Sequence, residues 1–179
     1  MNARCGFGWS VFTAAAMAVM GCATQTQLER VEVPQIAGPL SIRVVPCVDR
    51  TGTATRDVAA DATMAFQSRL AASREFRVAN DARFELTCDV TAFVEGSALK
   101  RWILPGWGAT SCQVAAMVTD QSTGHTIFTG RSTADVSSGG LYTVGAETYI
   151  VDAAIADLVA QMEKAVAARS VGSEPSSRQ

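Results

Sequence analysis

The sequence has very little of the chemistry that metal sites and hydrolytic active sites require. It contains one histidine, His125, whereas a zinc site needs about three or four His, Cys or acidic ligands and a Ser-His-Asp triad would have to use this one residue. It also lacks a basic block, with 15 Lys and Arg against 17 Asp and Glu, which argues against a nucleic acid partner. We therefore expect no metal, no cofactor and no catalytic residues, and predict that the protein is not an enzyme.

Long apolar runs are also scarce. Phe7–Met20 is largely apolar but too short for a membrane-spanning helix, which needs about 20 such residues. Arg4 precedes it and small residues follow, a pattern typical of a secretory signal. Val19-Met20-Gly21-Cys22 resembles a lipobox, the cleavage site of the bacterial lipoprotein signal peptidase, although Met20 stands where a small residue is usual. The alternative is an ordinary signal peptide cut near Ala16-Met17-Ala18. We predict that residues 1–21 are a lipoprotein signal peptide removed between Gly21 and Cys22.

The lipobox resemblance implies that Cys22 carries the membrane anchor. Its thiol would take a diacylglyceryl group and its amine a fatty acyl chain such as palmitate. Each buried CH₂ contributes about 0.8 kcal/mol, so several chains make release negligible. Ala23, rather than Asp, follows the cysteine, which resembles the Gram-negative sorting pattern for the outer membrane. We expect a lipid-anchored protein that faces the periplasm, with residues 22–39, broken by Pro34 and Gly38, as the lipidated cysteine and its tether.

Cysteines 47, 88 and 112 remain in the mature chain, an odd number for an oxidising compartment. A hairpin around residues 96–109 would place Cys88 opposite a residue near 117, which puts Cys112 out of disulfide reach. A bond between Cys47 and Cys88 is geometrically freer. We expect instead that all three are buried thiols acting as small apolar residues.

Residues 40–168 carry the patterns of one folded domain, in line with a content of 48% hydrophobic and 18% charged residues. Strands are predicted over 40–48, 75–79, 84–95, 112–119 and 125–132, and helices over 56–73 and 145–168. Each helix has an apolar stripe, formed by Val58, Ala62, Phe66 and Leu70 in the first and by Val151, Ile155, Leu158, Met162 and Val166 in the second.

Residues 84–95 alternate, so that Phe84, Leu86, Cys88, Val90, Ala92 and Val94 should face the core and Phe93 should point outward. The order β-α-β-β-β-β-α predicts an α/β or α+β two-layer sandwich, with helices packed on a mostly antiparallel or mixed sheet. Residues 169–179 are predicted to be a disordered tail.

Several short motifs together resemble known envelope lipoproteins. Val44-Val45-Pro46 runs into Asp49-Arg50-Thr51-Gly52, Leu104–Gly108 precedes a strand, Asp120–Gly124 forms a hairpin turn, and an Ala-rich helix closes the chain. The set resembles uncharacterised Gram-negative lipoprotein families with a domain like the N-terminal domain of TolB, related in fold to the curli secretion protein CsgG and to PelC. The resemblance implies a non-enzymatic accessory or scaffold domain that contacts an envelope protein or its own copies.

One connecting segment is unusual in its side chains. Between two predicted strands lie Lys100, Arg101, Trp102, Ile103, Leu104 and Trp107. Trp and aliphatic residues beside a basic pair suit a membrane surface or a protein partner. The alternative is that the loop folds back and covers the end of the sheet. A second functional hypothesis is a periplasmic module that binds a glycan or a small ligand, for which the two Trp residues are the one hint.

Overall fold

The computed structural model describes residues 23–36, 38–52, 56–104, 107–137 and 144–171. The predicted signal peptide and Cys22 lie outside these residues, as does the predicted tail from residue 172 onward, whereas residues 169–171, also predicted as tail, are helical. The strands are β1 (Ala23–Val31), β2 (Leu40–Val44), β3 (Val48–Asp49), β4 (Phe76–Val78), β5 (Phe84–Val94), β6 (Thr110–Asp120) and β7 (Thr126–Val136). The helices are α1 (Val58–Ala72), α2 (Ala98–Ile103) and α3 (Ala146–Val171).

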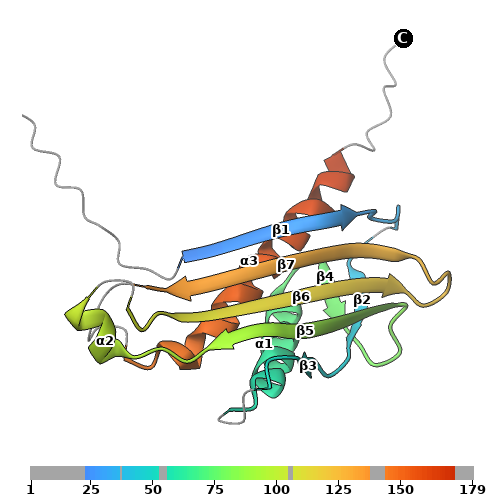
Figure 1. The fold of residues 1–179 in the computed structure, drawn as a ribbon. Coiled ribbons are helices and arrows are strands. Elements are labelled where there is room, and N and C mark those ends of the chain that lie inside the picture. The colour runs from blue at the N-terminus through green and yellow to red at the C-terminus, as the bar shows by residue number, and fades with distance from the viewer. Residues whose placement is uncertain (1–22, 37, 53–55, 105–106, 138–143, 172–179) are drawn as a thin grey trace, which may run out of the picture.

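The strands form one mixed sheet in the order β1-β7-β6-β5-β2-β4, with β3 also paired to β5. β1, β7, β6 and β5 are antiparallel, whereas β2 is parallel to both β4 and β5. Figure 1 shows α1 and α3 on the same side of the sheet, so the molecule has two layers. The predicted α+β sandwich and its order of elements are confirmed, with β1, β3 and α2 as additions.

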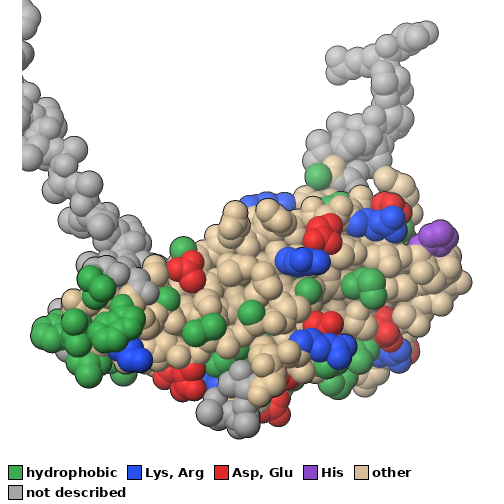
Figure 2. Space-filling model, in the orientation of Figure 1, with side chains coloured by type: hydrophobic (Ala, Val, Ile, Leu, Met, Phe, Trp, Pro, Cys, Tyr) green, Lys and Arg blue, Asp and Glu red, His purple; other side chains and the backbone are tan. Residues whose placement is uncertain are grey.

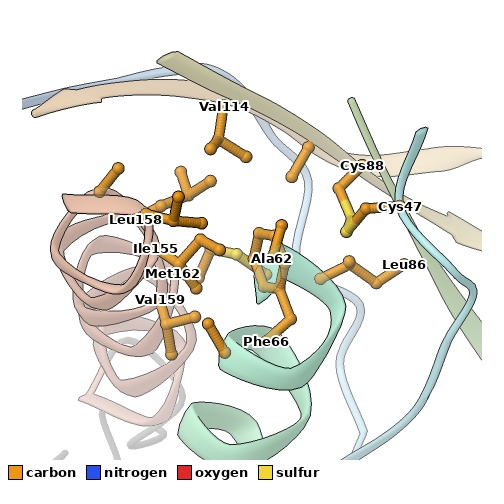
Figure 3. Packing of buried hydrophobic residues seen from close by; sticks show 14 of the residues in the cluster. Cys47, Ala62, Phe66, Leu86, Cys88, Val114, Ile155, Leu158, Val159 and Met162 are labelled. Carbon is orange, nitrogen blue, oxygen red and sulfur yellow. A yellow bond between two sulfur atoms is a disulfide. The ribbon is translucent and has the colours of Figure 1, made fainter. Parts of the chain in front are cut away.

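The core lies between the sheet and the two long helices. α3 packs on β1, β6 and β7, while α1 packs on β2, β3, β4 and β5 and against α3. Every residue of the two predicted apolar stripes is buried, as Figure 3 shows for Ala62, Phe66 and Ile155. Burial of such stripes removes apolar area from water, which is the main term that stabilises this layer arrangement.

A disulfide bond joins Cys47 and Cys88, so the prediction of three free thiols is wrong. β3 pairs in parallel with β5, with Val48 beside Asp89, and this register brings the preceding residues together with their Cα atoms 4.7 Å apart. The distance lies within the usual disulfide range. Cys112 is a buried free thiol, as predicted, and burial raises its pKa to about 12.

The predicted tether is also wrong over about half of its length, because residues 23–31 form the edge strand β1. Most β1 side chains are exposed, and a polar sequence of this kind gives no core-facing stripe. Its attachment depends on backbone pairing with β7, on a 2.8 Å hydrogen bond between the Thr26 and Ser132 hydroxyls, and on Leu28. Leu28 packs over Gly130, where a Cβ atom would lie 2.8 Å from Leu28 Cδ2 and 3.1 Å from Leu158 Cδ1.

A β-bulge in β5 reverses the predicted orientation of its last residues. The register with β6 shifts between Val90 and Ala92. An extra residue in one strand turns all later side chains to the other face. Phe93, predicted to point outward, is therefore buried, whereas Ala92 and Val94, predicted to face the core, are exposed.

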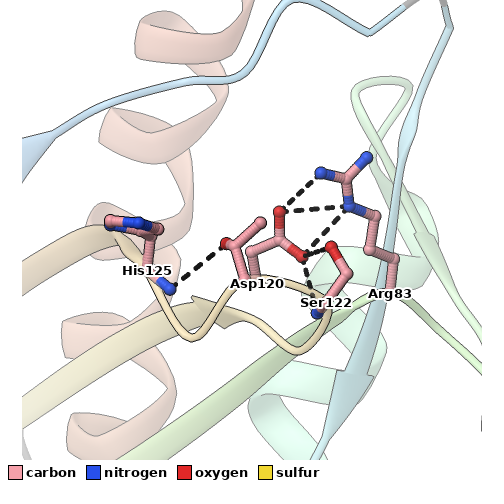
Figure 4. A network of polar contacts seen from close by, with 5 residues as sticks. Arg83, Asp120, Ser122 and His125 are labelled. Atoms are coloured by element: carbon pink, nitrogen blue, oxygen red, sulfur yellow. Dashed lines mark hydrogen bonds and ion pairs between the residues drawn. The ribbon is translucent and has the colours of Figure 1, made fainter.

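Asp120 stabilises the β6–β7 hairpin, which lies at the end of the sheet away from α2 (Figure 4). Its buried carboxylate accepts hydrogen bonds from Arg83 Nη2 at 2.6 Å and from the Ser122 hydroxyl at 2.6 Å. The Arg83 guanidinium, followed by the Ser122 donors, holds the pKa of Asp120 well below its usual range. Gly124 has φ of 72°, which confirms the predicted turn. His125 is exposed in this turn.

Candidate functional site

The segment between β5 and β6 presents an exposed apolar surface. We call Leu99, Trp102, Ile103, Leu104 and Trp107 the α2 surface. Each of these side chains is between 50% and 64% exposed, so they do not fold back over the sheet. Figure 2 shows apolar side chains gathered over α2 at one end of the molecule. Exposed apolar patches of this kind mark contacts with proteins or membranes.

The segment was predicted as a plain loop, but its centre is the helix α2. The Ser97 hydroxyl caps the helix by accepting a hydrogen bond from the Lys100 N–H. At the other end, the Leu104 N–H donates to the Lys100 carbonyl at 3.0 Å, and the Trp107 N–H donates to the Leu104 carbonyl at 3.0 Å. These bonds fold the segment into a compact unit, although it is too short to show helical periodicity in the sequence.

Two glycines close the base of this unit. The Ser97 N–H donates to the Gly108 carbonyl at 2.9 Å, which joins the segment's two ends. A Cβ atom at Gly96 would collide with the Gly108 carbonyl and would lie 2.5 Å from Thr110 Oγ1. Gly108 itself has φ of 76°, in the region that favours glycine. The α2 surface is therefore held at a fixed place on the end of the sheet.

The segment between β5 and β6 carries a net positive charge. Residues 96–109 contain Lys100 and Arg101 and no acidic residue. Lys100 Nζ lies 5.6 Å from the centre of the Trp107 ring, a cation–π contact that keeps the ammonium beside the apolar surface. Arg101 belongs to α2, and its side chain lies outside the described part of the structure. The six residues predicted as a contact segment thus share one structural unit, and their contact role stays a prediction.

The helix-free face of the sheet carries an open hollow of about 250 Å³. Its lining includes Glu29, Asp89, Met117 and Arg131, with Glu29 and Arg131 paired at 3.3 Å, and neither Trp102 nor Trp107 contributes to it. Ligand sites are usually larger and more enclosed, at about 300–1,000 Å³. The Trp residues that suggested a glycan or small-ligand module therefore do not line this hollow.

Within the ranges that the structure describes, no three His, Cys, Asp or Glu side chains are grouped so that they could hold a metal ion. The prediction that the protein is not an enzyme remains untested. None of the helices in the same ranges is both long and apolar enough to cross a membrane.

No protein-family model matches the sequence, and comparison with curated proteins finds no match. Several solved structures are similar in fold. The PelC dodecamer from Paraburkholderia phytofirmans is 18% identical, with 76% of this chain and 96% of that chain covered and a TM-score of 0.54. A hypothetical protein from Chlamydia trachomatis is 13% identical, with 72% and 99% covered and a TM-score of 0.51. A protein from Xanthomonas campestris is 14% identical, with 80% and 96% covered and a TM-score of 0.51.

Identities this low show a common fold and no more. The predicted resemblance to PelC is confirmed at the level of the fold. The predicted likeness to the N-terminal domain of TolB and to the curli secretion protein stays a prediction.

Proposed function

We propose that this protein is a lipoprotein of the bacterial envelope, anchored through Cys22 at the outer membrane and facing the periplasm, which works through contacts rather than catalysis. The observation that carries the contact role is the α2 surface, because five large apolar side chains are exposed on a unit closed by backbone hydrogen bonds. A monomer with no partner gains nothing from keeping them in water.

The disulfide bond supports export of the domain. Bonds such as Cys47–Cys88 form and persist in oxidising compartments, which include the bacterial periplasm. Export is what the apolar N-terminal segment and the lipobox-like Val19-Met20-Gly21-Cys22 predict from the sequence. Two unrelated features, one covalent and one a targeting pattern, therefore favour the same location.

The one buried charge among the described residues has a structural role, which is compatible with a protein that works through contacts. Asp120 is the one charged side chain that is buried among the described residues. Its carboxylate is paired with the Arg83 guanidinium and accepts hydrogen bonds from the Ser122 N–H and hydroxyl. These contacts stabilise the β6–β7 hairpin. A reactive carboxylate usually has a pKa raised toward neutral pH, whereas the pKa of Asp120 is lowered.

We further propose that the chain binds copies of itself or an envelope protein. The PelC structure that shares its fold is a dodecamer. The experiment is to express the full chain, label cells with an alkyne-tagged fatty acid, and measure the mass of the detergent-purified protein by light scattering.

Label on the wild type and its loss in Cys22→Ser are the expected results, with a mass several times that of one chain. An unlabelled wild type would overturn the anchor. A strict monomer at high concentration, with no protein cross-linked to it in cells, would overturn the association.

A further inference from the structure

The register of the sheet places the start of the mature chain and the α2 surface at the same end of the molecule. Ala23, the first residue of β1, pairs with Asp135 of β7. Asp135 pairs with Ser111 of β6, and Ser111 pairs with Val94 of β5. These four residues form one row across the sheet, and α2 begins four residues after Val94 (Figure 1).

Neighbouring strands in a sheet lie about 4.8 Å apart, so the row from Ala23 to Val94 is about 14 Å long. Cys22 is joined to Ala23 by a single peptide bond, which adds only about 3.8 Å between Cα atoms. Because β1 begins at Ala23, no free tether separates the proposed anchor from the folded sheet. Wherever the acyl chains on Cys22 enter a bilayer, this end of the sheet must be close to its surface.

We propose that the α2 surface lies in the lipid–water interface of the membrane that holds Cys22, so that the sheet stands with this end on the membrane and the β6–β7 hairpin pointing away. This inference rests on the proposed lipidation. The lipid surface is the one partner whose position the chain itself fixes, since the anchor and the α2 surface share one end of one sheet.

The side chains of the α2 surface fit this partner. Tryptophan favours the headgroup level of a bilayer, and leucine and isoleucine favour the acyl chains just below it. Lys100 can keep its stem along apolar surface while its ammonium reaches a lipid phosphate. Two acidic residues lie close to the segment 96–109 but outside it. Glu95 directly precedes the segment in the chain, and Asp135 belongs to the row of paired residues across the sheet.

The mature chain provides its own probe for this contact. Of the three Trp residues, Trp9 lies in the predicted signal peptide, which leaves Trp102 and Trp107, both in the α2 surface. The experiment is to reconstitute the purified mature lipoprotein into phosphatidylglycerol-containing vesicles whose acyl chains carry bromine, a contact quencher of Trp. Residues of an interfacial helix lie roughly 5–10 Å into the headgroup and acyl boundary, so we expect about a twofold loss of fluorescence relative to unbrominated vesicles.

A paired variant and a matched control locate the effect. Ile103→Ser with Leu104→Ser removes two apolar side chains of the surface, spares both Trp residues and should abolish most of the quenching. Val31→Ser is the control, because Val31 is 45% exposed but pairs with Phe128 at the other end of β1. It should leave the quenching unchanged. Circular dichroism checks that each variant is folded.

The outcomes separate the inference from the function on which it rests. Fatty-acid label together with quenching that the paired variant abolishes supports both. Label without quenching overturns the membrane contact and leaves the lipoprotein assignment, and burial of the Trp residues only when a protein partner is added would assign the α2 surface to that partner. Absence of label overturns both.

Discussion

Removal of the Cys47–Cys88 disulfide should cost a large part of the stability of the domain. The two cysteines are separated by 41 residues in the sequence. Without the cross-link, the unfolded chain has more conformational entropy. For a loop of this length, that gain lowers the free energy of unfolding by about 4 kcal/mol at 25 °C. Domains are usually stable by about 5–15 kcal/mol, so the loss is substantial, and it corresponds to a fall of roughly 8–16 °C in Tm for a chain of this size.

The assay is urea unfolding of the mature protein with and without reductant, compared with the double variant Cys47→Ala, Cys88→Ala. Wild type with reductant should unfold close to the double variant, and the double variant should not respond to reductant. Thiol titration of the unfolded, unreduced wild type should count one thiol, Cys112. Three titratable thiols, or a reductant effect below about 1 kcal/mol, would show that the cross-link or the entropy reasoning is wrong.

Three further substitutions test the contacts that hold the β6–β7 hairpin, β1 and α2 in place. Asp120→Asn should lower the free energy of unfolding by about 1–2 kcal/mol at pH 7, since half-exposed Arg83 loses a charged partner. Because the folded pKa of Asp120 lies below its unfolded value, the gap between variant and wild type in pH-dependent urea melts should shrink as pH falls below about 4. Gly130→Ala should cost about 1–3 kcal/mol and speed hydrogen exchange in β1, because its methyl group would crowd Leu28. Gly96→Ala should displace α2 and reduce Trp quenching by brominated vesicles, although both Trp residues remain.

The contact segment could be located from the sequence, but its exposure could not. The sequence shows two Trp residues and Lys100 in the segment between two predicted strands. Whether they cover the sheet or face solvent depends on the close approach of Gly96 and Gly108, which are twelve residues apart and meet only after folding. A helix as short as α2 also leaves too few residues for a periodic signal.

The sequence by itself determined the two helices, the long strands and their order, because each of these elements repeats its apolar residues with its own period. It did not determine β1, the β5 bulge or the disulfide. β1 is polar and is a strand only because β7 offers it an unpaired edge. Phe93 is buried only because one extra residue shifts the register of β5 against β6. Cys47 meets Cys88 only because β3 lies in parallel beside β5, a pairing between segments far apart in the chain. Local periodicity is a property of the chain, whereas register, edge pairing and cross-links are contacts between distant segments, and the tertiary structure decided them.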